Sequence, residues 1–317
     1  MRRSVFPGEM TADQRSDSRD GRRARCFMHV PKSAGSSVFE ALTAAFPAGA
    51  IAPQRHDHVN LAPFRDFDAL APQLRAVIAT NSEELLALAQ FDIVCGHFVL
   101  PSLLRIARPE AIATIVREPR ARLLSLYAYW AIEDFSAAAP YAAWQHASRP
   151  LCEFLSEVTI APVIDNQLCR MLLHGDPRIP MTGFIARDAS EALVEESLRR
   201  LETLGFVGIQ ELPDGLWDGL STVFRVPLEP ERANVTASLR GRPRCPPIAT
   251  AIDEKTLTLL EHRTDVDGRI YRELVMRTRG ASVDPDALAT VSFLRQLVAL
   301  GTVLSEDDAF SAATRDG

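Results

Sequence analysis

The sequence predicts an α/β domain in which a parallel β-sheet is flanked by helices on both faces. The first reason is an alternation: short apolar runs of strand length are followed by longer segments whose apolar residues recur at helical spacing. The second is that small and polar residues follow several of these runs directly, where the strands of a parallel sheet end. With 317 residues, 47% of them hydrophobic, the chain is long enough for one large domain or two smaller ones, and we expect one.

The net charge of −6 argues against a general electrostatic attraction to nucleic acid or to an anionic membrane. We therefore expect no nucleic-acid partner, and any anion site must use a few placed cations. The five cysteines form no C-x-x-C pair, so neither a disulfide framework nor a zinc site is indicated. Residues 1–24 are polar and arginine-rich without an apolar signal region, and no apolar run is long enough to span a membrane. We expect a disordered N-terminal tail and a cytoplasmic location.

The first predicted strand, about residues 25–30, leads into a loop and then into a helix that ends near Phe46. The loop is rich in small and hydroxyl residues: Pro31, Lys32, Ser33, Ala34, Gly35, Ser36 and Ser37. Small residues let the backbone approach a ligand, and the N–H groups of the first helical turn then point at it. With the Lys32 charge and the added hydroxyls, the loop is predicted to hold a phosphate-like anion. It is not a Walker A loop, in which the lysine follows the last glycine.

A second buried strand is predicted over residues 91–98 and ends in Gly96-His97. A histidine just past the carboxyl end of a strand lies where open α/β sheets bind their ligands. A single histidine is nevertheless more often a hydrogen-bonded structural residue. Between the first helix and this strand, the polar segment with His56-Asp57-His58 is interpreted as a loop facing the substrate. A metal site there is disfavoured, because no cysteine or carboxylate cluster completes a set of ligands.

The third predicted strand, residues 111–116, ends at Arg117, and Pro119 suits the first turn of the following helix. Ser125 lies about two turns into that helix, so a ligand across the helix start can meet Arg117 and Ser125 together. The alternative for Arg117 is a salt bridge to a nearby carboxylate. The pairing of an arginine at a strand tip with a serine on the next helix indicates a second anion site.

The rest of the chain is predicted to be mainly helical, with one further strand. The polar run Asp165–Gln167, followed by Arg170, either lines a pocket or forms an exposed face. Ser190 is expected to cap a helix, and a basic loop with Arg240 and Arg242 either caps a bound anion or is solvated surface. The expected elements are helices at 191–204, 216–224, 257–260 and 267–276, a strand at 206–209, and a C-terminal helix with an acidic tail within residues 280–317.

Three motifs together resemble the carbohydrate sulfotransferases that use 3′-phosphoadenosine-5′-phosphosulfate (PAPS), in particular the heparan sulfate and uronyl 2-O-sulfotransferases. The segment Phe27–Ser37 is similar to the family's 5′-phosphosulfate loop. The run from Arg117 to Tyr127, which reads Arg-x-Pro-x-x-Arg-(two apolar)-Ser-x-Tyr, resembles its 3′-phosphate motif. Cys95-Gly96-His97 is similar to its His-Gly-His motif, whose second histidine is the catalytic base. The resemblance covers about residues 26–277 and leaves out both tails.

The resemblance implies a sulfotransferase fold with a P-loop-like parallel sheet, over residues 25–279. It implies in-line transfer of a sulfuryl group from PAPS to an acceptor hydroxyl on a carbohydrate or glycoconjugate, without a metal. His97 is the implied base, and Lys32 the implied cation at the oxygen between phosphate and sulfate. The 5′-phosphosulfate is assigned to Pro31, Lys32, Ser33, Ala34, Gly35, Ser36 and Ser37, and the 3′-phosphate to Arg117 and Ser125. We also assign Arg240 and Arg242 to the bound nucleotide.

One departure from the family pattern is Cys95, which stands where the family has its first histidine. A non-catalytic nucleotide-binding protein on the same fold therefore stays an alternative. A P-loop kinase is a weaker one, because Lys32 precedes Gly35 and no acidic residue for magnesium is evident. The loops at residues 56–75 and 137–170 are expected to decide which acceptor binds, and the oligomeric state stays open.

Overall fold

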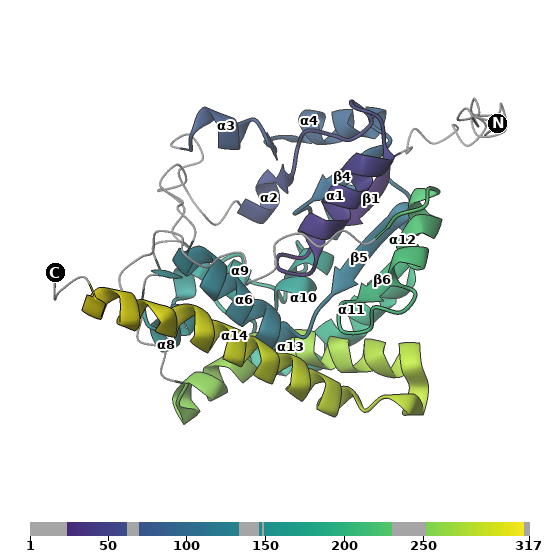
Figure 1. Cartoon of the computed structure of the whole chain (residues 1–317). Helices are drawn as coiled ribbons and strands as arrows, with labels where there is room; N and C mark the ends of the chain where they lie inside the picture. Colours follow the sequence, from purple (N-terminus) through teal and green to yellow (C-terminus); the bar gives the residue numbers. More distant parts are fainter. Residues whose placement is uncertain (1–23, 62–69, 133–145, 148, 230–251, 314–317) are drawn as a thin grey trace, which may run out of the picture.

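A four-stranded parallel sheet forms the centre of the domain (Figure 1). The computed structural model describes residues 24–61, 70–132, 146–147, 149–229 and 252–313. The strand order is β4-β1-β5-β6, and each neighbouring pair is parallel. The strands are β1 (Arg25–Met28), β4 (Ile93–Gly96), β5 (Ile112–Val116) and β6 (Phe206–Ile209). The predicted α/β class with a parallel sheet is confirmed.

Helices cover both faces of the sheet, as the sequence predicted. Successive strand residues point to opposite faces. Phe27 and Ile115 pack against α1 (Gly35–Ala45) and α12 (Leu216–Phe224). On the other face, Met28 and Val116 belong to the core with three further helices, α10 (Gln167–Leu172), α11 (Ser190–Glu202) and α13 (Glu254–Arg279). The strands are continuously apolar because both of their faces are buried.

The order in which strands are added to the sheet switches sides between the parallel strands β1 and β5. From β1 the chain reaches β4 on one side, and from β5 it reaches β6 on the other. Open α/β sheets bind ligands in the crevice at such a switch point, outside the carboxyl ends of the strands. The segments that follow β1 and β5 carry Lys32 and Arg117. The topology therefore places both predicted cations at the same edge of the sheet.

The segment expected to be a loop around His56 is instead a short strand. β2 (His56–Asp57) pairs in parallel with β3 (Ile78–Ala79), and His56 forms a parallel bridge with His97. His97 N–H donates to Arg55 O at 2.7 Å, and Asp57 N–H donates to His97 O at 3.2 Å. These backbone hydrogen bonds hold the segment as a strand although its residues are polar. The prediction of a loop was therefore wrong. α2 (His58–Leu61) begins immediately after the strand.

Two predictions about the helices need correction. Ser190 is the first residue of α11, and no side chain caps that helix. The two helices expected at 257–260 and 267–276 are one continuous helix, α13. The side chain of Asn81 caps α4 (Ser82–Ala87), because it accepts from the N–H groups of Glu83 and Glu84. The other helices are α3 (Pro72–Arg75), α5 (Leu100–Leu103), α6 (Pro119–Ile132), α8 (Leu151–Ser156), α9 (Ala161–Ile164) and α14 (Pro285–Ala313).

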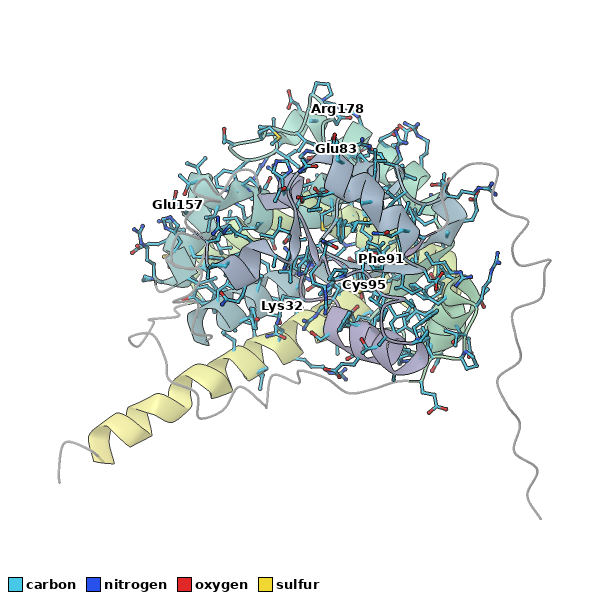
Figure 2. All side chains as sticks on the ribbon, turned by 90° about the horizontal axis from the view of Figure 1, so that it is seen from above. Lys32, Glu83, Phe91, Cys95, Glu157 and Arg178 are labelled. Atoms are coloured by element: carbon cyan, nitrogen blue, oxygen red, sulfur yellow. The ribbon has the colours of Figure 1, made fainter. Side chains whose placement is uncertain are left out.

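Helix α14 packs along α6, and its C-terminal end extends beyond the rest of the domain (Figure 2). Phe293 and Leu300 are buried in a second apolar cluster with Leu123 and Tyr127 of α6. The expected C-terminal helix is therefore present and is longer than the amphipathic segment that predicted it. Across the described ranges, no helix is both long and apolar enough to cross a membrane.

Candidate functional site

The loop between β1 and α1 has the backbone shape of an anion cradle. Lys32 and Ala34 have positive φ angles of 68° and 57°, while Ser33 between them does not. Alternation of left-handed and right-handed residues turns successive N–H groups toward one concave side, as in phosphate-binding nests. The first helical hydrogen bond runs from Val38 N–H to Ala34 O at 3.2 Å. The N–H groups of Gly35 and Ser36 therefore lie before the hydrogen-bond ladder and face the cradle.

Two details of the loop fit a bound anion. The Ser33 side chain is fully buried, and its Oγ has no hydrogen-bond partner. Buried polar groups almost always have a partner, and a ligand oxygen in the loop would supply it. A Cβ on Gly35 would lie only 2.0 Å from the His29 ring, so the glycine lets that ring pack against the helix start. The loop thus presents an unpartnered hydroxyl group at Ser33 and packs against an imidazole at Gly35.

The predicted residues of the two anion sites converge on this loop. Arg117, at the end of β5, donates from Nη1 to Lys32 O at 3.1 Å. Lys32 Nζ lies 4.0 Å from the centre of the Tyr129 ring on α6, at cation–π distance. Ser125 is one helical turn before Tyr129 and therefore lies on the same face of α6. The structure brings Lys32 and Arg117 into contact and places Ser125 on the face of α6 that turns toward Lys32.

Arg117 is not held by a carboxylate in the part of the chain that the structure describes. Its second hydrogen bond runs from Nη2 to Gln296 Oε1 on α14, at 2.8 Å. Burial lowers the pKa of Arg117, and the charges of Glu211 and Glu118 oppose that shift. The guanidinium stays protonated, since arginine does not lose its proton in proteins. The salt-bridge alternative for Arg117 finds no support among these residues, because both hydrogen bonds go to neutral oxygens.

Arg122 is a second buried cation beside Arg117. It is 2% exposed, and its Nη1 donates to Gln167 Oε1 at 3.0 Å, while Nε and Nη2 have no partner. Burial lowers the pKa of Arg122 to about 10, Asp267 opposes this, and the charge of Arg117 adds to it. The sequence motif contained Arg122, yet no role was assigned to it. Its spacing of three residues from Ser125 on one helix face was the signal that would have placed it near the site.

His97 is held in one tautomer by a hydrogen bond that it donates to the backbone carbonyl of His29, the residue after β1. Its Nδ1 lies 2.9 Å from His29 O. Because a carbonyl oxygen only accepts, Nδ1 carries the proton, and the lone pair of the neutral ring is on Nε2. Burial lowers the pKa of His97, the bond to His29 O opposes the shift, and the charge of Lys32 lowers the pKa further. A neutral imidazole with its Nε2 lone pair available is what a general base requires.

Two further imidazoles flank His97, and the sequence reasoning did not assign either to the site. The rings of His29 and His56 lie 4.3 Å and 5.1 Å from that of His97, both nearly parallel to it. Burial and the neighbouring His97 lower the pKa of His56 to about 3, and burial holds the pKa of His29 well below its ordinary value. All three rings are therefore neutral near pH 7. The segment around His56 was predicted to face the substrate, but the stacking of His29 and His56 on His97 could not be read from spacing along the chain, because it depends on which strands are neighbours.

Cys95 is part of the apolar core and does not belong to this stack of rings. It is 2% exposed and packs in the same cluster as Phe27 and Val38, beneath α1. Burial raises the pKa of its thiol to about 12, so the side chain stays uncharged. A thiol in this position acts as a small apolar group. The imidazoles next to His97 come from His29, directly after β1, and from His56 of β2 instead.

The polar run at residues 165–170 is buried, which excludes the exposed face, one of the two alternatives that the sequence left open. Arg170 Nη2 pairs with Asp165 Oδ2 at 2.7 Å, and the Asp267 carboxylate accepts the N–H groups of Leu168 and Cys169 at the start of α10. Asn166 Oδ1 accepts from the N–H groups of Val266 and Asp267 in α13. The run mainly joins α10 to α13, which explains why polar residues interrupt an apolar helix.

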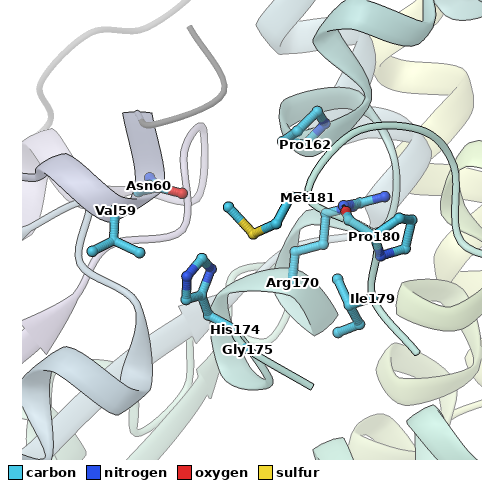
Figure 3. Close-up of a pocket in the computed structure, with 9 residues that line it drawn as sticks. All are labelled: Val59, Asn60, Pro162, Arg170, His174, Gly175, Ile179, Pro180 and Met181. Carbon is cyan, nitrogen blue, oxygen red and sulfur yellow. The ribbon is translucent and has the colours of Figure 1, made fainter. Parts of the chain in front are cut away.

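A small pocket lies between α2 and the segment that contains α10 and the residues after it (Figure 3). Val59 and Asn60 of α2 line one side, and Arg170, His174 and Met181 line the other. The pocket thus draws on both segments that were expected to select the acceptor, residues 56–75 and 137–170. Arg170 contributes to its wall, as one of the two alternatives predicted, but its guanidinium is already bound to Asp165 and to the carbonyl oxygens of Pro180 and Gly183.

Some predicted residues lie outside the described part of the chain. They include Arg240 and Arg242 of the basic loop and nearly all of the N-terminal tail. Within the described ranges, no group of three or more histidine, cysteine or carboxylate side chains is arranged to hold a metal ion. Comparison with protein-family models finds no matching family, and a search among curated proteins finds none similar to this chain.

Proposed function

We propose that this protein is a sulfotransferase that moves a sulfuryl group from PAPS to an acceptor hydroxyl on a carbohydrate or glycoconjugate. The single observation that carries the proposal is the convergence of three predicted groups on the β1–α1 loop. Arg117 donates to the Lys32 carbonyl, and the Lys32 charge acts on His97. An anion cradle, a second cationic site and a neutral base within one crevice match the needs of group transfer from a nucleotide phosphorylated at both ends. On this proposal the parallel sheet is that of the sulfotransferase fold.

The loop and the end of β5 divide the binding of the nucleotide between them. The backbone N–H groups at the start of α1, with the unpartnered Ser33 hydroxyl, would hold the 5′-phosphate. Arg117 would hold the 3′-phosphate with its forked guanidinium, assisted by Ser125. The unpartnered nitrogens of Arg122 add positive potential behind that site. The residues present therefore fit PAPS, which supplies an activated sulfuryl group when bound.

The chemical roles fall to His97 and Lys32. His97 Nε2 accepts the proton of the acceptor hydroxyl, since Nδ1 is already committed to His29 O. The Lys32 ammonium stabilises the negative charge that grows on the leaving oxygen. Lys32 also favours the neutral form of His97. The same cation would therefore stabilise the leaving group and keep the base unprotonated. The pocket beside β2 is the proposed place of the acceptor, with Asn60 and His174 as hydrogen-bonding groups for its hydroxyls.

A non-catalytic nucleotide-binding protein is the second candidate, and Cys95 favours it. The proposed family has a histidine at that position, and here the side chain is apolar core. The rings of His29 and His56 beside His97 favour the enzyme instead. They give His97 imidazole neighbours even though position 95 is a cysteine.

An acceptor screen with labelled PAPS separates these candidates. We expect wild-type protein to transfer labelled sulfate to at least one carbohydrate or glycoconjugate and to release 3′-phosphoadenosine 5′-phosphate. Tight binding of that nucleotide without transfer to any acceptor would select the second candidate. Absence of binding would reject both, and magnesium-dependent ATP hydrolysis would select the P-loop kinase instead.

A further inference from the structure

Helix α14 reaches the proposed nucleotide site with one buried side chain. Gln296 is 5% exposed, and its Oε1 accepts from Arg117 Nη2 at 2.8 Å. Because a guanidinium only donates, the amide oxygen has to face Arg117. The amide nitrogen, Nε2, is then left buried, and it has no hydrogen-bond partner. A native buried amide donor without an acceptor calls for an explanation, and a ligand is one.

Neighbouring contacts fix the position of Gln296. One turn earlier, Ser292 Oγ donates to Glu211 Oε1 at 2.8 Å. The Phe293 ring is buried in the cluster with α6, and the guanidinium of Arg120 lies over it at 4.7 Å. These contacts dock α14 against the tip of β6 and the start of α6. Gln296 is therefore held beside Arg117 by its own helix, and its amide is not free to turn toward solvent.

The polar groups around Arg117 contain more donors than acceptors. Gln296 Nε2 and the Nε and Nη2 of Arg122 have no partner. Glu118 is engaged, since its two oxygens accept from Arg120 Nε and from Ala121 N–H. Glu211 Oε1 accepts from Glu118 N–H and from Ser292, and the Tyr271 hydroxyl lies within hydrogen-bonding reach of the same carboxylate. An excess of buried N–H groups suits a ligand that brings several oxygens, which is what a phosphate does.

We propose that Gln296 is a ligand of the nucleotide's 3′-phosphate, donating from Nε2 to a phosphate oxygen while Oε1 holds Arg117 in place. This inference rests on the proposed function, and it adds to the site a helix beyond residues 26–277, which carry the family resemblance. Gln296 then contributes to the preference for nucleotides that carry a 3′-phosphate. Nucleotides without that group gain nothing from it.

Calorimetry with two nucleotides that differ only in the 3′-phosphate tests the proposal. The probes are 3′-phosphoadenosine 5′-phosphate and adenosine 5′-phosphate, titrated into the full chain. Gln296→Ala is expected to weaken binding of the first about tenfold or more, as for a lost hydrogen bond to a charged group, and to leave the second unchanged. Gln296→Glu is expected to weaken it further, because a carboxylate replaces the donor and repels the phosphate.

Two matched variants on the same helix separate this role from docking of α14. Leu294→Ala changes a side chain that is 52% exposed, and it is expected to change neither affinity. Ser292→Ala removes the bond to Glu211 without touching the amide, and it is expected to retain most of the preference. Thermal unfolding of each variant shows whether α14 still packs.

A double-mutant cycle decides whether Gln296 acts directly or through Arg117. In an Arg117→Ala background, a direct donor still lowers the affinity for the 3′-phosphorylated nucleotide when it is removed. Loss of that effect would overturn the assignment and leave Gln296 as a positioning residue. Tighter binding by Gln296→Ala would also overturn it, because the amide would then compete with phosphate for Arg117. If wild-type protein does not discriminate between the two nucleotides, the proposed function itself fails.

Discussion

At His97, one backbone carbonyl decides which nitrogen can act as a base. His29 O binds the Nδ1–H group, so the lone pair of the neutral ring is on Nε2. The rings of His29 and His56 stack on the His97 ring and resist protonation themselves. The site therefore keeps three neutral imidazoles in contact, and only the central one is fixed by a hydrogen bond to the His29 carbonyl.

His97→Ala should lower kcat by about 10²–10⁴, the usual effect of losing a general base. Binding of 3′-phosphoadenosine 5′-phosphate should change little, because His97 does not contact the proposed phosphate sites. The comparison variant is His262→Ala, which removes an exposed imidazole on α13. An unaltered sulfate-transfer rate in His97→Ala would assign the ring a structural role.

The pKa of His97 should lie below its ordinary value of 6.5, because burial and the Lys32 charge both favour the neutral ring. An NMR titration of the imidazole signals, assigned with His97→Asn, measures it. In Lys32→Met the pKa should rise, since one positive neighbour is gone. A wild-type value above 6.5, or no rise in the variant, would contradict the electrostatic effect of Lys32 on His97.

The sequence predicted those site residues that stand next to a glycine, a proline or the end of a predicted strand. Lys32, His97 and Arg117 are of this kind, and the structure gathers them around one loop. His29 and Gln296 were not found. His29 stacks on His97, which follows the neighbouring strand β4. Gln296 is 179 residues from Arg117 along the chain. Their roles depend on strand order and helix docking, which local patterns do not encode.

At the scale of the element, the β1–α1 unit depends on the close approach of His29 and Gly35. A Cβ added at Gly35 would lie inside the His29 ring's contact distance. The anion cradle and the stack of rings are therefore built on opposite sides of one helix start, and a change on one side is expected to disturb the other.

Gly35→Ala should destabilise the protein by about 1–3 kcal/mol, the usual effect of overpacking, and should weaken nucleotide binding. Urea unfolding and calorimetry measure the two effects. Since the clash is with His29, the His29→Ala/Gly35→Ala double variant should be less destabilised than the sum of the single variants. Simple additivity would show that the two residues do not meet.

Element boundaries were predictable where a strong apolar run or a turn residue marked them, and less so elsewhere. The strand and helix at residues 206–209 and 216–224 were predicted with the bounds that the structure has. The break expected within α13 came from its polar middle section. That section is helical because buried Thr264 and Val266 pack inward and Asn166 binds the backbone there. Tertiary contacts of this kind are invisible in a local pattern.

For the whole molecule, the strand order explains why the candidate residues meet. The four parallel strands end at one edge, and the switch point lies between β1 and β5. The sequence predicted parallel strands with helices on both faces, but it did not predict their order. The contacts of α14 with Arg117 and Glu211 also arise only once the chain has folded around the sheet.

The partly buried histidines His29, His56 and His97 should make stability depend on pH. Folding lowers their pKa values, so between the folded value and about 6.5 the unfolded chain binds more protons. The free energy of unfolding should therefore fall as pH drops below about 6.5, by up to about 1.4 kcal/mol per pH unit for each histidine. His56, whose pKa is about 3, should contribute throughout the range from 6 to 4. Urea unfolding of His56→Gln should show a shallower dependence, and an unchanged slope would contradict the burial of a neutral His56.

The central claim is that the β1–α1 loop holds the nucleotide and that Lys32 assists the departure of sulfate from it. The most direct test compares Lys32→Ala with wild-type protein, using labelled PAPS and an acceptor identified by the screen. We predict that the variant loses turnover while keeping much of its affinity for 3′-phosphoadenosine 5′-phosphate, which its backbone N–H groups and Arg117 still bind. Sulfate transfer by Lys32→Ala at the wild-type rate would contradict the account.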